Sequence, residues 1–158
     1  MSDVPMVGSM IVVRRIHEGV LAHLPIRISE WLMAYPAACM GLALMMQPTM
    51  FATSPSFGAI ERLGDEAFWT TLVLLCAVVR LIALTVNGTF ENFKYSPHLR
   101  LAASAVGIAF WSQFTLGFLM SALFEHGAWS AVVAYSTFCL AELANIYRSW
   151  VDVTKARK

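Results

Sequence analysis

The stretch AFWTTLVLLCAVVRLIALTV, residues 67–86, decides the fold of this chain. It carries one charged side chain, Arg80. In an α-helix about twenty such residues rise about 30 Å, which is the thickness of the hydrocarbon core of a bilayer. A guanidinium at that depth costs at least about 2.5 kcal/mol, so we expect Arg80 to have a partner or a hydrated cavity.

The composition points to lipid as part of the solvent. The chain has 158 residues, the size of one domain, of which 58% are hydrophobic and 13% are charged. Soluble domains carry about 25% charged residues. The net charge of +1 and the lack of a basic face interleaved with aromatics argue against nucleic acid as a partner.

Three further apolar stretches have the length of a membrane-crossing helix. Together with 67–86 they predict an all-α, polytopic four-helix bundle over residues 31–148, with spans at 31–51, 67–86, 101–124 and 128–147. Residues 52–66 and 87–100 are expected as loops, and Asn87-Gly88 is a turn signal. Gln47-Pro48 should weaken the first span, and Ser29 is a plausible cap for it.

The two ends of the chain are expected outside the hydrocarbon. Residues 1–30 form a leader in which apolar positions recur at helical spacing between 10 and 24, with Arg14, Arg15 and Glu18 between them. This pattern indicates a short amphipathic helix on the membrane surface, and a solvated leader is the alternative. Residues 149–158 are expected to form a basic tail.

The basic residues predict the topology. With four spans, both termini and the 87–100 loop share one side of the membrane. Nine of the eleven Lys and Arg residues would lie there: Arg14, Arg15, Arg27, Lys94, Arg100, Arg148, Lys155, Arg157 and Lys158. Arg62 alone would lie on the other side. The positive-inside rule then gives cytoplasmic termini for a multi-pass membrane protein.

Glu142 is the acidic residue placed like Arg80. Both lie near the inner end of spans that run from outside to inside, so at about 1.5 Å per residue they reach nearly the same depth. We interpret them as an intramembrane charged pair that sets the register of two helices. Two alternatives remain: the charges line a polar pathway, or Arg80 extends to the inner headgroups. Asn87 and Asn145 are candidates to extend the polar cluster.

Small residues four apart predict close helix contacts. The candidate pairs are Ala37 with Gly41, Ala103 with Gly107, and Gly117 with Ser121.

No residue pattern asks for an enzyme. All four histidines lie outside the predicted spans, which argues against a haem held between them. The three cysteines are scattered through apolar stretches and match no metal motif. We therefore expect no catalytic residue, no cofactor and no metal site.

Three segments carry a resemblance. They are Arg80-Leu81-Ile82-Ala83-Leu84 leading into Asn87-Gly88, then Ser96-Pro97-His98-Leu99-Arg100, then Ala144-Asn145-Ile146-Tyr147-Arg148. Over residues 67–152 the chain resembles small, uncharacterised four-span inner-membrane proteins of tailed bacteriophages and prophages. The resemblance implies a phage-encoded protein in the host cell inner membrane, and it assigns no functional residue.

Three functions are compatible with these observations. The first is a non-enzymatic, holin-like protein that oligomerises through small-residue faces and permeabilises the membrane. The second is a structural or interaction subunit of a membrane complex, or a superinfection-exclusion protein, with the leader and the tail as contact surfaces. The third is a small ion or solute channel. The expected partners are the lipid bilayer and either further copies of the chain or another membrane protein.

Overall fold

The computed structural model describes residues 4–89, 93 and 95–155, with side chains described except for residues 4–9, 87 and 88. Within these ranges every regular element is a helix, which confirms the all-α prediction. The elements are α1 (Val4–His23), α2 (Ile28–Met46), α3 (Met50–Thr53), the 3-10 turn η1 (Pro55–Phe57), α4 (Gly58–Glu61), α5 (Glu66–Thr89), α6 (Ser96–Phe124) and α7 (Trp129–Lys155).

Three helices of the described chain are long and apolar enough to cross a membrane. They are α2, the Glu66–Val86 part of α5, and α6. Helix α7 is as long as these with 27 residues, but its sequence is more polar and it does not join this group. The membrane character that the composition predicts is therefore visible in three of the four predicted spans.

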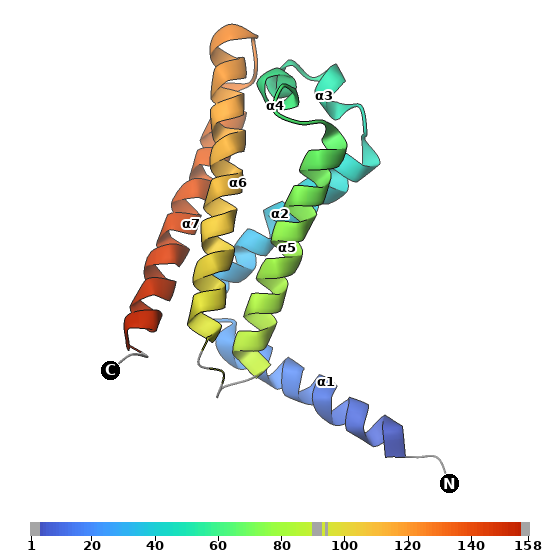
Figure 1. The fold of residues 1–158 in the computed structure, drawn as a ribbon, viewed down its shortest axis with the longest axis vertical. Helices are drawn as coiled ribbons and strands as arrows, with labels where there is room; N and C mark the ends of the chain where they lie inside the picture. The colour runs from blue at the N-terminus through green and yellow to red at the C-terminus, as the bar shows by residue number, and fades with distance from the viewer. Residues whose placement is uncertain (1–3, 90–92, 94, 156–158) are drawn as a thin grey trace.

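The long helices pack in two pairs that share a central contact. Helix α2 lies against α5, α7 lies against α6, and α5 contacts α6 between the pairs (Figure 1). The lower end of the view holds the last turns of α5 and α7 and the start of α6, and α1 leaves the bundle there at a steep angle. The upper end holds α3, α4 and the turn between α6 and α7.

Several predicted boundaries differ from the observed helices. Helix α2 ends at Met46 because Pro48 disfavours helical backbone at Gln47, whose ψ is 75°. Ser29 lies inside α2 and caps nothing, since Arg27 occupies the N-cap position. Helix α5 continues to Thr89, so Asn87-Gly88 is helical backbone and not a turn.

The predicted loop 52–66 is largely helical and belongs to the core. Its short elements α3, η1 and α4 close the upper end of the bundle. Ile60 of α4 is fully buried and sits where a side chain on Gly117 would be. Phe57 contacts the ring of Phe118 edge-on, with centroids 5.1 Å apart.

The ends also differ from the prediction. Helix α1 spans Val4–His23, where the sequence predicted a helix over 10–24. The basic tail expected from residue 149 instead continues α7 to Lys155, with Arg157 and Lys158 outside the described residues. Whether α1 lies on a membrane stays a prediction.

The core changes character along the bundle. Its upper part is aromatic, with rings from α5, α6 and α7 in contact around Phe114, which is fully buried between Trp69 and Tyr135. The lower part instead buries charged and polar side chains, namely Glu30, Arg80, Arg100, Ser104, Glu142, Asn145 and Ser149.

Candidate functional site: two buried polar clusters

The central polar site consists of Arg80, Ser104, Glu142 and Asn145. Arg80 of α5 forms an ion pair with Glu142 of α7, and the two side chains are 5% and 1% exposed. The same guanidinium donates a hydrogen bond from Nη2 to the carbonyl of Ala103 in α6, at 3.3 Å. Arg80 therefore turns into the bundle, where it joins three helices.

Gly107 lets the pair form. A Cβ atom at this position would lie 2.7 Å from Arg80 Nη2 and would overlap Glu142 Oε1. Real Cβ atoms do not approach other atoms so closely, so the pair occupies the space that glycine leaves open. The small residue that the sequence suggested for helix packing here makes room for a charged pair.

Two further polar groups lie beside the Glu142 carboxylate. The side chains of Ser104 and Asn145 lie against the Glu142 carboxylate. Within the described part of the chain, Glu142 Oε2, Ser104 Oγ and Asn145 Nδ2 are buried and have no hydrogen-bond partner within 3.5 Å. A carboxylate acceptor thus lies beside a hydroxyl and an amide that can both donate, which is a chemically complementary set.

Asn145 also connects the site to α2. Ser29 Oγ donates to Asn145 Oδ1 at 2.7 Å and accepts from Arg148 Nη1 at 2.9 Å. Ser29 is thus a bridge between helices instead of the predicted cap. The side chain of Asn87, predicted to extend this cluster, lies outside those that the structure describes.

A second cluster, which we call the end network, lies nearer the lower end of the bundle. It consists of Arg27, Glu30, Arg100, Ser149 and Asp152, contributed by the α1–α2 junction, α2, α6 and α7. Arg100 is at its centre, and its side chain is fully buried. Arg100 was predicted to lie in the 87–100 loop, and this prediction is wrong because α6 begins at Ser96.

The contacts of the end network neutralise its charges. Arg100 donates from Nε to Glu30 Oε2 at 2.7 Å, from Nη2 to Glu30 Oε1, and from Nη1 to Asp152 Oδ2 at 3.0 Å. Arg27 donates to the same Asp152 oxygen at 2.7 Å. Partial burial would raise the pKa of Asp152, but the hydrogen bonds and charges of the two arginines outweigh it and lower that pKa.

The remaining predicted packing residues are buried between elements. Ala37 is buried in the core, and a Cβ at Gly41 would overlap the side chain of Leu74 in α5. Ser121 accepts a hydrogen bond from the Ala59 amide at 3.2 Å and donates to Glu125. Ala103, Gly107 and Gly117 are likewise buried. All six small residues therefore serve contacts within one chain.

The two clusters can hold helices in register, and their chemistry is electrostatic. In the part of the chain that the structure describes, no three His, Cys, Asp or Glu side chains are grouped as a metal site requires. The three cysteines are free thiols in that same part. No protein-family model, curated protein or solved structure that was compared with the chain matches it.

Proposed function

We propose that α2, α5, α6 and α7 all cross the bacterial inner membrane. The arrangement of polar side chains in α7 supports its inclusion. Glu142, Asn145 and Ser149 are buried against α5, α2 and α6 respectively, whereas Val133, Leu140 and Leu143 are exposed. These three polar residues therefore point away from lipid, as in a membrane helix whose polar face is buried in protein.

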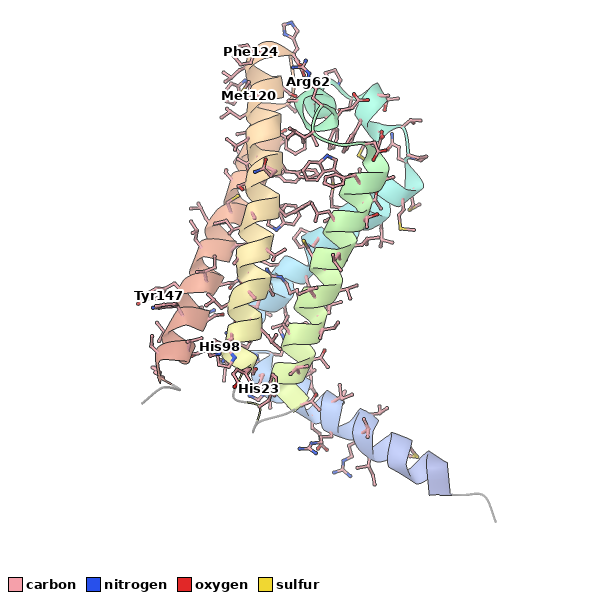
Figure 2. All side chains as sticks on the ribbon, in the orientation of Figure 1. His23, Arg62, His98, Met120, Phe124 and Tyr147 are labelled. Carbon is pink, nitrogen blue, oxygen red and sulfur yellow. The ribbon has the colours of Figure 1, made fainter. Side chains whose placement is uncertain are left out.

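The distribution of basic residues supports cytoplasmic termini. The described arginines and lysines, apart from Arg62 and the buried Arg80, belong to α1, the α1–α2 junction and the lower ends of α6 and α7. Figure 2 shows Arg62 at the end opposite to His23 and His98. The positive-inside rule assigns the basic end to the cytoplasm.

We further propose that the protein is a non-enzymatic structural or interaction subunit of a membrane complex. The observation that carries this proposal is that the chain satisfies its own intramembrane charges, through Arg80 with Glu142 and Arg100 with Glu30. A closed bundle of this kind has no need of a charged partner and offers a fixed outer surface. Helix α1 extends from it with Met10, Ile11, Val12 and Val13 exposed.

Holin-like permeabilisation is the less favoured reading. It requires small-residue faces that are free to join many copies, and the six predicted small residues pack within one chain. A channel through the central polar site is also less favoured, because its two charges bind each other. A phage origin stays a prediction of the resemblance alone.

Two experiments test the proposal. In a background with Cys39, Cys76 and Cys139 replaced by alanine, Glu61→Cys should react with a membrane-impermeant maleimide in whole cells. His98→Cys should react only after the cells are permeabilised, because it lies at the opposite end. The reverse pattern would refute the orientation, and equal labelling would refute the four-span topology.

The second experiment addresses the role in the cell. Induced expression should leave the membrane potential and growth unchanged, and purification in mild detergent should recover a complex larger than one chain. Collapse of the potential on induction would instead support the holin-like function. A complex that disperses when Val12→Asp is introduced, but not when the exposed His17→Asp is, would assign the contact to the side of α1 that carries Val12.

A further inference from the structure

Gln113 places an unsatisfied amide on the outer surface of α6. The residue is exposed, and it has no hydrogen-bond partner among the residues that the structure describes. Helix α6 is one of the three helices suited to crossing a membrane. An amide without a partner costs several kcal/mol in hydrocarbon, where water cannot replace the missing hydrogen bonds.

A groove runs beside this amide. It has a volume of about 620 Å³ and lies between α4 and α6. Most of its lining is apolar: Leu63, Leu116, Met120 and Phe124, with Arg62 and Glu125 paired at its upper end. Figure 2 shows Met120, Phe124 and Arg62 together in the upper part of the molecule. The polar amide therefore lies in an uncovered surface that is mostly apolar, with the Arg62–Glu125 pair at its upper end.

We infer that this surface binds the same surface of a second copy of the chain, with the two Gln113 amides hydrogen-bonded to each other. The inference rests on the proposed membrane placement. Two copies inserted with the same orientation are related by a twofold axis along the membrane normal. Equal residues then lie at equal depth, so Gln113 of one α6 faces Gln113 of the other.

The chemistry of the amide favours a second copy of the chain over lipid as the occupant of this surface. A carboxamide is both donor and acceptor, so two copies satisfy each other reciprocally. A lipid acyl chain can fill the groove but cannot hydrogen-bond to the amide. Side-chain hydrogen bonds of this type stabilise contacts between membrane helices.

Disulfide formation in native membranes tests the inference. In the cysteine-free background, Leu116→Cys keeps Gln113 and should give a covalent dimer under mild oxidation, because Leu116 is exposed in the same groove. Thr137→Cys is a matched control, because Thr137 is exposed on α7. Leu116 is eight residues from the end of α6 at Phe124, and Thr137 is eight from the start of α7 at Trp129, so both lie about 12 Å from the upper end. The control should remain monomeric.

A second measurement compares the association of the wild-type chain, which has Gln113, with that of variants at this position. Energy transfer between labelled copies in lipid vesicles should show that Gln113→Leu weakens association about three- to thirtyfold, whereas Gln113→Asn retains more of it. A monomeric Leu116→Cys variant, dimers at both cysteine positions, or no effect of Gln113→Leu would each overturn the inference. Carbonate extraction distinguishes a failure of the dimer from a failure of the proposed membrane placement. A chain that stays in the membrane as a monomer refutes only the dimer. A chain that carbonate releases refutes the membrane placement.

Discussion

Arg100 and Glu30 form a two-pronged ion pair across the contact between α6 and α2. The Nε of Arg100 donates to Glu30 Oε2 at 2.7 Å and its Nη2 donates to Oε1. The two side chains are 0% and 3% exposed. Because both charges are removed from solvent, each depends on the other for compensation. This pair ties the start of α6 to the start of α2.

We therefore expect Glu30→Gln to destabilise the bundle by about 3 kcal/mol, because it leaves the buried guanidinium of Arg100 with less compensation. Thermal unfolding in detergent micelles measures the effect. The matched control is Glu18→Gln, which breaks the exposed pair of Glu18 with Arg14. Exposed pairs contribute little, so the control should not change the unfolding temperature. Equal effects of the two substitutions would contradict the prediction that the buried ion pair contributes more to stability than the exposed one.

The Arg80–Glu142 pair predicts a double-mutant result. Arg80→Met leaves a buried carboxylate and Glu142→Gln leaves a buried guanidinium, so each should cost about 3–5 kcal/mol. The double variant buries no uncompensated charge and should be more stable than either single variant. Denaturant titration in mixed micelles measures all four free energies of unfolding. Losses that simply add would show that the two residues stabilise the bundle independently.

The two ion pairs differ in how far the sequence could predict them. Arg80 and Glu142 are each the single charge within an apolar stretch, and that isolation marks them as partners. Glu30 and Arg100 lie at the edges of such stretches, where charged residues are ordinarily solvent-exposed. Their pairing depends on α2 and α6 beginning earlier than the hydropathy indicates.

A periodic pattern in the sequence does indicate the buried polar residues that the prediction did not include. Glu142, Asn145, Ser149 and Asp152 recur at spacings of three and four, so they share one face of α7. Arg100, Ser104 and Gly107 repeat this spacing in α6. A polar stripe on each of two helices that are joined by a tight turn predicts that the stripes face each other. The closure of the upper end by α3 and α4 had no such signal, because short helices lack a period.

Gly107 should tolerate no side chain. Gly107→Ala places a Cβ against Arg80 and Glu142, and overpacking of this kind costs about 1–3 kcal/mol. Gly64→Ala is the control, since its Cβ would meet the ring of Phe68, which is exposed and free to move. The unfolding temperature of both variants in micelles provides the measurement. A neutral Gly107→Ala would mean that the pair can shift at no cost.

The pH dependence of the end network follows from Asp152. Arg27 and Arg100 lower the pKa of this carboxylate in the folded protein. A lowered folded pKa means that the carboxylate stabilises the fold above its ordinary pKa of about 3.9, and that this contribution disappears as the pH falls through the folded pKa. The difference in unfolding temperature between the wild type and Asp152→Asn should therefore be constant from about pH 8 to pH 5 and shrink below about pH 4.

Removing Arg27 tests whether its charge helps to lower the pKa of Asp152. In an Arg27→Gln background Asp152 keeps only Arg100 as a cationic partner, so its pKa should be less depressed. The stabilising effect of Asp152 should then be lost at a higher pH than with Arg27 present. The measurement is the same pair of unfolding curves, repeated at each pH with and without Arg27. A stabilising effect that fades near pH 6 in the wild type would contradict the lowered pKa, because only a raised pKa places the transition there.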